Sequence, residues 1–221
     1  MTSPVKQRSY NSPLRRNQAA LTRQLILDAA QRRFEADGFQ LASVAAIAAD
    51  AGVSTKTVHT AFQTKASLLA AVWDARLAAD EAAVPVFERR WFRELTASPS
   101  PEDKLRRLAR QSRQVKERSG DLMEVIRNAA SVDDQIGQLW EDIQAKLLLV
   151  QRAVVDQLEE KHALRPTLRV EAAADVLWTL NHPNLWHLLV RGRRWTSEQY
   201  ETWLAEAFCS ELLRSWHRST A

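Results

Sequence analysis

The sequence predicts an all-α fold, and three observations support this prediction. Gly and Pro number only five and seven among 221 residues, about half the share of an average globular chain, whereas sandwiches and barrels need many turns. No segment alternates apolar and polar residues with the period of two that a half-buried strand shows. Capping residues instead precede apolar runs of helical period along most of the chain.

The first third of the chain predicts an arm followed by helices. Residues 1–17 are polar and basic without apolar periodicity, so we expect a flexible basic arm. The first helix should end before Gly38, because glycine adopts the left-handed conformation of a C′ residue. The apolar stripe expected for this helix consists of Leu21, Leu25, Ile26, Ala29, Ala30 and Phe34. The helices expected in this part cover 17–37, 44–51 and 55–62, with a fourth beginning at residue 65.

The remaining two-thirds predict further helices separated by clear breaks. Gly120 should end one helix, and Asp121 with Glu124 forms a capping-box pattern for the next. His182–Pro183 should interrupt a later helix, and Thr196 with Gln199 forms another capping box. The helices expected beyond residue 90 cover 91–95, 101–118, 121–130, 131–162, 167–190 and 197–215.

Charge and aromatic residues are distributed unevenly. Residues 1–65 hold nine Lys and Arg but four Asp and Glu, whereas the remainder holds 22 basic and 23 acidic residues. All eight Trp lie at or after Trp73. This asymmetry predicts a polyanion-binding module joined to a near-neutral domain with another role. A solvated basic tail is the alternative explanation, because residues 6–16 supply four of the nine basic side chains.

Residues 43–62 have the pattern of a helix-turn-helix. Ala48 is small enough for two helices to approach closely, and Gly52 permits the tight turn between them. Lys65 opens the following helix, whose N-terminus favours a phosphate. Helix-turn-helix shapes also occur in proteins that bind no nucleic acid, but the local basic excess favours DNA. The exposed positions expected on the second helix are polar and include no acid, as a major-groove recognition helix requires: Thr55, Lys56, Thr57, His59 and Thr60.

Residues 19–73 resemble the DNA-binding domain of the TetR (tetracycline-repressor) family. The family usually has Tyr at the position of His59, and Gly or Pro is common at the position of Lys56. Both departures fall on positions that read bases in the family, so they affect the expected operator sequence and not the DNA-binding role. The resemblance implies base contacts for Thr55, Lys56 and His59, phosphate contacts for Ser43, Thr57 and Lys65, and either contact for Thr60. The matching pieces are Ile26–Ala30, Phe34, Gly38–Phe39, Ile47–Ala48, Ala51–Ser54, Thr57–Val58, Phe62, Lys65 and Leu68–Leu69.

The C-terminal region resembles the same family more diffusely, at 174–178 and 195–204. The resemblance implies that the helices at 167–190 and 197–215 dimerise and that the helices before them enclose an effector pocket. We therefore expect an arm at 1–17, a helix-turn-helix domain at 18–64, and an effector-binding and dimerisation domain at 65–221. The predicted effector is a small, mostly apolar organic molecule, and closed core packing is the alternative. The candidate pocket residues are Met123, Trp140, Trp178, Asn181, His182 and Trp186.

The overall prediction is a homodimeric transcriptional regulator that binds a palindromic operator in double-stranded DNA and is released by its effector. We expect the regulator to act as a repressor. We also expect no enzymatic activity, no cofactor and no metal, because no phosphate loop, metal cluster or nucleophile–base pair can be placed. No apolar run is long enough for a membrane span, and the single cysteine, Cys209, favours a cytoplasmic location. The alternatives are an architectural DNA binder without a ligand and an all-α enzyme.

Overall fold

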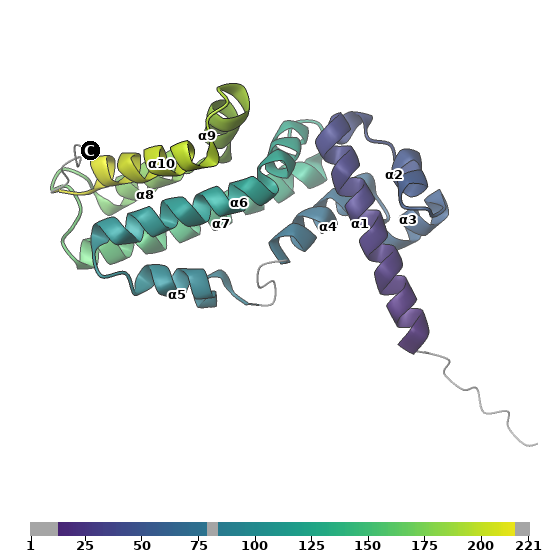
Figure 1. The fold of residues 1–221 in the computed structure, drawn as a ribbon, viewed down its shortest axis with the longest axis horizontal. Coiled ribbons are helices and arrows are strands. Elements are labelled where there is room, and N and C mark those ends of the chain that lie inside the picture. The colour runs from purple at the N-terminus through teal and green to yellow at the C-terminus, as the bar shows by residue number, and fades with distance from the viewer. Residues whose placement is uncertain (1–12, 79–83, 215–221) are drawn as a thin grey trace, which may run out of the picture. The chain divides into compact units, whose positions relative to one another are not determined.

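The computed structural model describes residues 13–78 and 84–214. The chain divides into two compact units, Met1–Val72 and Trp73–Ala221. Within the described ranges the only β-structure is one isolated antiparallel bridge between Leu164 and Leu213, and helices form the rest of the framework (Figure 1). The all-α prediction is therefore confirmed.

The N-terminal unit is built from α1 to α3 and the first turns of α4. Gly38 interrupts α1 with φ 72° and ψ 171°, so the chain bends where the sequence predicts a C′ glycine. A side chain is strained at such a positive φ, whereas glycine is not. The bounds of these helices are α1 Pro13–Leu41, α2 Val44–Asp50, α3 Thr55–Phe62 and α4 Lys65–Ala78.

The start of α1 differs from the prediction. The helix begins at Pro13, so residues 13–17, which we assigned to the arm, are helical, and the remainder of the arm lies outside the described residues. Proline suits the first turn of a helix because its fixed φ is already helical and it lacks the N–H that would find no partner there. Leu21 and Leu25 were expected in the apolar stripe but are 63% and 46% exposed. Both precede Ile26, where the packed part of α1 begins.

The core of the N-terminal unit lies where the three helices meet α4. Buried apolar side chains from every helix meet there, and this burial supplies most of the stability of so small a unit. Arg33 on α1 pairs bidentately with Asp50 at the end of α2, through Nε–Oδ2 and Nη2–Oδ1 contacts of 2.6 and 3.0 Å. The core side chains include Ile26, Ala30, Phe34, Ile47, Val58, Phe62, Leu68 and Leu69.

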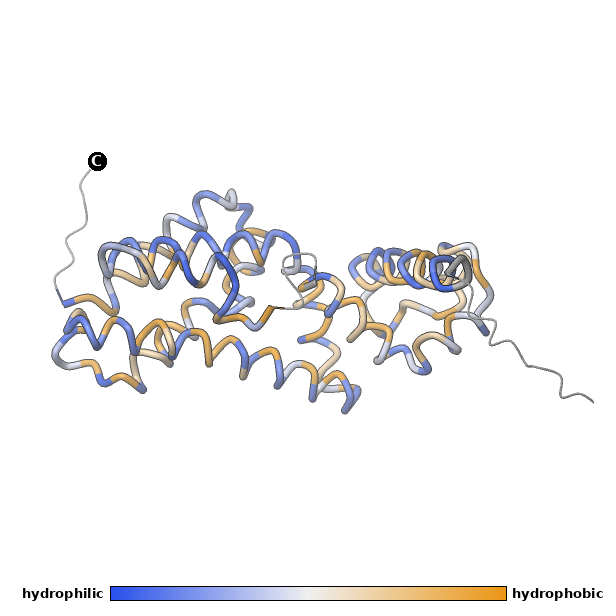
Figure 2. The backbone as a smooth tube through the Cα atoms, turned by 90° about the horizontal axis from the view of Figure 1, so that it is seen from below, coloured by the Kyte–Doolittle hydropathy of each residue, from blue (hydrophilic) through white to orange (hydrophobic). Residues whose placement is uncertain are grey.

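The C-terminal unit has long helices at its centre. The helix α6 packs against α7 and α10, and α8 packs against both α7 and α10, as the ribbon shows (Figure 1). Hydrophobic and hydrophilic residues alternate along these helices (Figure 2), as expected for elements with one buried face. The bounds are η1 Val86–Glu88, α5 Arg90–Thr96, α6 Pro101–Ala129, α7 Asp134–Glu160, α8 Val170–Leu180, α9 Pro183–Trp186, η2 His187–Gly192 and α10 Ser197–Leu212.

The helix boundary predicted at Gly120 is wrong. Gly120 was expected to separate two helices, but α6 continues through it from Pro101 to Ala129. The glycine serves close packing instead, because a Cβ atom at this position would lie 2.9 Å from Nε1 of Trp186. Gly120 is therefore small because Trp186 packs against it across the core, and not because a helix ends there.

The breaks around α9 and α10 follow the prediction. The side chain of His182 caps α9, whose first residue is Pro183, by accepting from Asn184 N. Thr196 and Gln199 form both hydrogen bonds of the predicted capping box at the start of α10.

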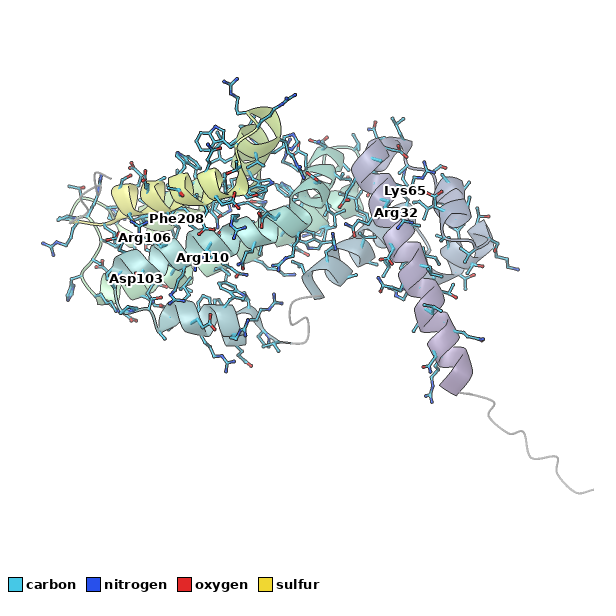
Figure 3. All side chains as sticks on the ribbon, viewed as in Figure 1. Arg32, Lys65, Asp103, Arg106, Arg110 and Phe208 are labelled. Carbon is cyan, nitrogen blue, oxygen red and sulfur yellow. The ribbon has the colours of Figure 1, made fainter. Side chains whose placement is uncertain are left out.

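The buried face of α10 changes how its apolar residues are interpreted. The resemblance implied that this helix takes part in dimerisation, so its apolar residues were expected to face a partner. Four of its large side chains are instead 0% exposed within the single chain, whereas Trp203 is only half-buried, and Glu201 further ties α10 to α6 through Arg110 and Arg113. Charge introduced at Leu212 would therefore disturb the protomer core. The fully buried side chains are Tyr200, Leu204, Phe208 and Leu212, with Phe208 and Arg110 labelled in Figure 3.

Candidate nucleic-acid interface and effector cavity

Two serine caps shape the helix-turn-helix. Ser43 Oγ accepts from Ala46 N at the start of α2, and Ser54 Oγ accepts from Thr57 N at the start of α3, both at 3.1 Å. Gly52 joins the two helices with φ 67°, a conformation that glycine adopts without strain. The caps fix where each helix begins and thereby which side chains α3 turns outward.

The predicted contact residues occupy the open face of this motif. Thr57 is half-buried, and its hydroxyl lies 2.9 Å from Ser54 Oγ. Thr60 Oγ1 donates to Lys56 O at 2.8 Å, which leaves its oxygen lone pairs as acceptors. The exposed members of the predicted set are Ser43, Thr55, Lys56, His59 and Thr60.

His59 has a defined orientation at the end of α3. Its Nδ1 lies 3.3 Å from Gln63 O, and a carbonyl oxygen can only accept, so Nδ1 is the protonated nitrogen. Nε2 of a neutral imidazole is then an acceptor, suited to an exocyclic amino group of adenine or cytosine. Gln63 itself has φ 59° and ψ −61°, a strained backbone that turns the chain tightly into α4.

Lys65 has a structural role that the sequence did not predict. Its Nζ donates to Gln40 O and Ala42 O, both at 3.2 Å, where α1 ends, and lies 4.4 Å from the ring centroid of Phe39. Figure 3 shows the residue beside these elements. An ammonium group has three N–H donors, so one remains beyond the two carbonyl contacts for a phosphate.

The C-terminal unit contains a cavity of about 500 Å³, within the range of small-molecule sites. Residues from α4, α6 and α7 and the segment before α5 line it, and most of them are apolar. Its lining consists of Trp73, Arg76, Leu77, Val84, Pro85, Val86, Arg89, Trp91, Leu108, Gln111, Ser112, Val115, Lys116, Arg118, Ser119, Met123, Ile143, Lys146, Leu147, Leu149, Val150, Gln151, Asn181 and Pro183.

The predicted pocket residues separate into two groups. Met123 and Asn181 line the cavity, whereas Trp140, Trp178, His182 and Trp186 do not belong to its described lining. The indoles of Trp140 and Trp178 pack edge-on against the His182 ring, at 5.9 and 5.4 Å between centroids. Trp186 packs likewise against Tyr200 at 5.0 Å. Aromatic packing within the unit thus accounts for the four residues outside the lining.

Lys116 is the most unusual residue of the cavity lining. It is 4% exposed, and its Nζ donates to Asn181 Oδ1 at 2.6 Å and to Tyr200 Oη at 3.1 Å. Burial lowers the pKa of Lys116 to about 7, because removing a charge from water favours the neutral amine. The same burial raises the pKa of Tyr200.

Residues 26–72 match the model of the bacterial regulatory proteins of the tetR family. This segment runs from the middle of α1 into α4 and contains the whole helix-turn-helix. The N-terminal unit therefore contains a segment similar to the regulatory proteins of the tetR family. No curated protein matches the sequence as a whole.

Solved structures of tetR-family regulators share the fold over most of the chain. NalD of Pseudomonas aeruginosa, the secondary repressor of the MexAB-OprM multidrug efflux pump, is 20% identical with a TM-score of 0.65, covering 90% of this chain and 100% of its own. A TetR transcription regulator from Haloarcula marismortui is 18% identical, with a TM-score of 0.64 and coverages of 87% and 99%. A protein described as a transcriptional regulator from Saccharomonospora viridis, in complex with choline, is 16% identical, with a TM-score of 0.69 and coverages of 88% and 98%.

The polar part of the cavity was missed by the sequence analysis of the tetR-like chain, although a signal was present. Lys116 lies four residues after Ser112 and eight after Leu108, on the apolar face of α6. A lysine on such a face is rarely buried without a partner, so it merited attention. The partner Asn181 was selected only because it precedes the break at Pro183.

The described ranges contain neither a metal-ion cluster nor a membrane-spanning helix. No group of three His, Cys, Asp or Glu side chains is placed there to hold a metal ion. None of the helices described combines the length and apolar character needed to cross a bilayer.

Proposed function

We propose that this chain is a homodimeric, cytoplasmic transcriptional repressor that binds a palindromic operator and leaves it when a small organic effector occupies the C-terminal cavity. The observation that carries the DNA-binding part is the open face of α3. Thr55, Lys56, His59 and Thr60 are exposed there, and they offer donors, acceptors and one positive charge without an acid. This is the inventory that a helix needs in the major groove.

The geometry of each side chain supports an assignment of single contacts. Lys56 has the positive charge suited to the acceptors of guanine, and the free Nε2 of His59 suits an amino group of adenine or cytosine. Ser43 and Thr57, at the starts of α2 and α3, and Lys65, at the start of α4, would contact phosphates. Phosphate contacts would position α3, and base contacts would select the sequence.

The effector part rests on the cavity and on α4. This helix begins with Lys65 and carries Trp73 and Leu77 of the cavity lining. Effector binding that alters the position of α4 would therefore weaken the match between two recognition helices and the operator. The two binding equilibria must then oppose each other by the same factor, and a tenfold effect corresponds to about 1.4 kcal/mol.

The deciding experiment is selection of duplexes from a random pool with the full-length protein. We expect a palindrome whose half-sites are separated by about one helical turn, ~34 Å, or modestly more. A screen of small molecules for release of the selected duplex then tests the effector part. Recovery of duplexes without common sequence would contradict specific recognition and favour an architectural role, and a selected operator that no compound releases would contradict the effector part.

A further inference from the structure

Five basic side chains line the cavity, and no acidic residue belongs to its described lining. These basic side chains come from α4, α6, α7 and the segment before α5, so they are distributed over several walls of the cavity and are not confined to one edge. Apolar side chains form most of the remaining wall. The cavity therefore combines a positive potential with an apolar interior, which favours a molecule with one negative group on an apolar body. The basic side chains are Arg76, Arg89, Lys116, Arg118 and Lys146.

Lys116 is the buried cation of this set, and its hydrogen bonds are incomplete. Its ammonium has three donors, of which Asn181 Oδ1 and Tyr200 Oη accept two. Both acceptors are uncharged, since burial keeps Tyr200 protonated. A buried ammonium without an anionic partner is costly, so the site would be stabilised by an anion that accepts the third hydrogen bond.

Lys104 shows what a structural buried lysine looks like on the same helix. It is 1% exposed, and its Nζ donates to Leu95 O, Thr96 O and Gln157 Oε1. All three of its donors are thus used, two of them on carbonyl oxygens at the end of α5. Lys104 does not belong to the described lining of the cavity, which makes it a matched control for Lys116.

Gln151 marks a second polar position of the cavity, one that calls for a hydrogen-bond donor and not for the carboxylate itself. It lines the cavity from α7 and is 1% exposed. Its Oε1 is buried and has no hydrogen-bond partner among the described residues. An unpaired buried carbonyl costs free energy, which a ligand or a water molecule donating to it would recover.

We propose that the effector is an amphipathic organic acid, whose carboxylate pairs with the ammonium of Lys116 while its apolar body fills the cavity between α6 and α7. This inference rests on the proposed effector function and names the chemical class of the ligand. A carboxylate accepts charge-assisted hydrogen bonds, which are about twice as strong as neutral ones. A neutral molecule of the same shape would leave the buried ammonium unpaired.

The proposal also predicts uptake of a proton on binding. Lys116 is partly neutral near pH 7, since burial lowers its pKa to about 7, and a bound carboxylate would favour the charged form. The titratable groups around Lys116 cannot account for this uptake of a proton. Burial raises the pKa of Tyr200, so this residue keeps its own proton, and the pKa of nearby His182 is lowered by burial and then by the charges of Lys116 and Arg127.

The test is calorimetric titration of the full-length protein, without DNA, with probes that share a shape and differ in charge. The probes are 4-butylbenzoate, 4-butylbenzamide and 4-butylbenzamidine, together with decanoate and decanamide. We expect an acid to bind more tightly than its own amide and the amidine. Titrations in phosphate and in Tris at pH 7.5 should give different apparent enthalpies, because protons are taken up from the buffer.

Two variants separate the role of Lys116 from general stability. Lys116→Met should weaken acid binding by about ten- to hundredfold, the value of one charged hydrogen bond, and abolish the buffer dependence. Lys104→Met should change neither, and thermal melting shows whether each variant is folded. Equal binding of acid and amide, absence of buffer dependence in the parent protein, or failure of every acid to bind would overturn the proposal.

Measurement of operator affinity separates the acid-binding site from the effector function. An acid that binds through Lys116 but leaves operator affinity unchanged supports the acid site and contradicts the effector function. A neutral compound that releases the operator equally well from parent and Lys116→Met protein supports the effector function and contradicts the acid site.

Discussion

Trp186 Nε1 would lie 2.9 Å from a Cβ atom on Gly120, so the indole and the helix α6 are in direct contact. Trp186 is 3% exposed and packs edge-on against Tyr200. The ring therefore has little room to withdraw.

Gly120→Ala should destabilise the protein although alanine favours helices. Overpacking of a core costs about 1–3 kcal/mol, while the change from Gly to Ala in a helix gains about 1 kcal/mol. We expect a net loss of roughly 1 kcal/mol, measured by urea unfolding. A Trp186→Ala background removes both ring atoms nearest to the added Cβ, Nε1 and Cδ1, so the same substitution should become neutral or stabilising there. Equal losses in both backgrounds would contradict the assigned contact.

Lys56→Ala and Lys65→Ala should weaken operator binding in different ways. Loss of a base contact at Lys56 should cost roughly 1–3 kcal/mol and relax the preference for one base pair. Loss of Lys65 should weaken binding to all duplexes alike and make the salt slope shallower by about one unit. Competition binding at several salt concentrations measures both effects.

The control for these variants is Lys161→Ala, which removes one exposed charge from the end of α7. It should leave sequence preference and salt slope unchanged. Lys65→Ala should additionally lower the stability of the N-terminal unit, because the carbonyl oxygens of Gln40 and Ala42 lose their donor. Parent-like binding by both lysine variants would contradict the assignment of α3 as the recognition helix.

Lys116 should make the free energy of unfolding depend on pH. Its pKa is 10.5 when exposed and about 7 in the folded chain, so between these values the unfolded state binds more protons. Stability contributed by this residue therefore rises as pH increases from about 7 to about 10.5. Lys116→Met should lack this rise, so its stability relative to the parent should be highest below pH 7. Parallel pH profiles from urea unfolding would show that the amine is not buried.

Dimerisation is best tested on α8, because most of the large apolar residues of α10 are buried within the protomer. Val176 is half-buried between exposed Ala172 and exposed Thr179 on one face of α8. Val176→Glu should place a charge in the proposed interface and give a folded monomer by sedimentation, with much weaker operator binding. Ala36→Glu, which adds the same charge at an exposed site of α1, should leave the mass unchanged. A monomeric parent protein at micromolar concentration would contradict the dimer itself.

The helix-turn-helix was predictable because local signals determine it. Ser43 and Ser54 cap their helices as expected, and Gly52 adopts the positive φ that its turn requires. Each signal acts within a few residues, so a single sequence contains it in full. Gly38, Pro183 and the Thr196–Gln199 capping box belong to the same class.

Features that depend on distant neighbours were not predictable from the sequence. Gly120 was interpreted as a helix end because the residue that requires a glycine there is distant in sequence. That residue, Trp186, lies 66 residues later. Leu21 and Leu25 follow the helical period but meet no partner that buries them. The aromatic residues chosen for the pocket pack elsewhere, and the polar centre at Lys116 depends on Asn181 and Tyr200 from two other parts of the chain.

The separate cores of the two units have a consequence for heating experiments. A ligand that binds only the folded form raises the melting point of whatever unfolds together with its site. A scanning calorimeter should therefore resolve two heat-absorption peaks, with operator DNA moving the one that belongs to Met1–Val72 and an organic acid moving the one that belongs to Trp73–Ala221. If an effector also lowers the temperature of the Met1–Val72 peak in the presence of DNA, the calorimeter measures the coupling between the two units directly.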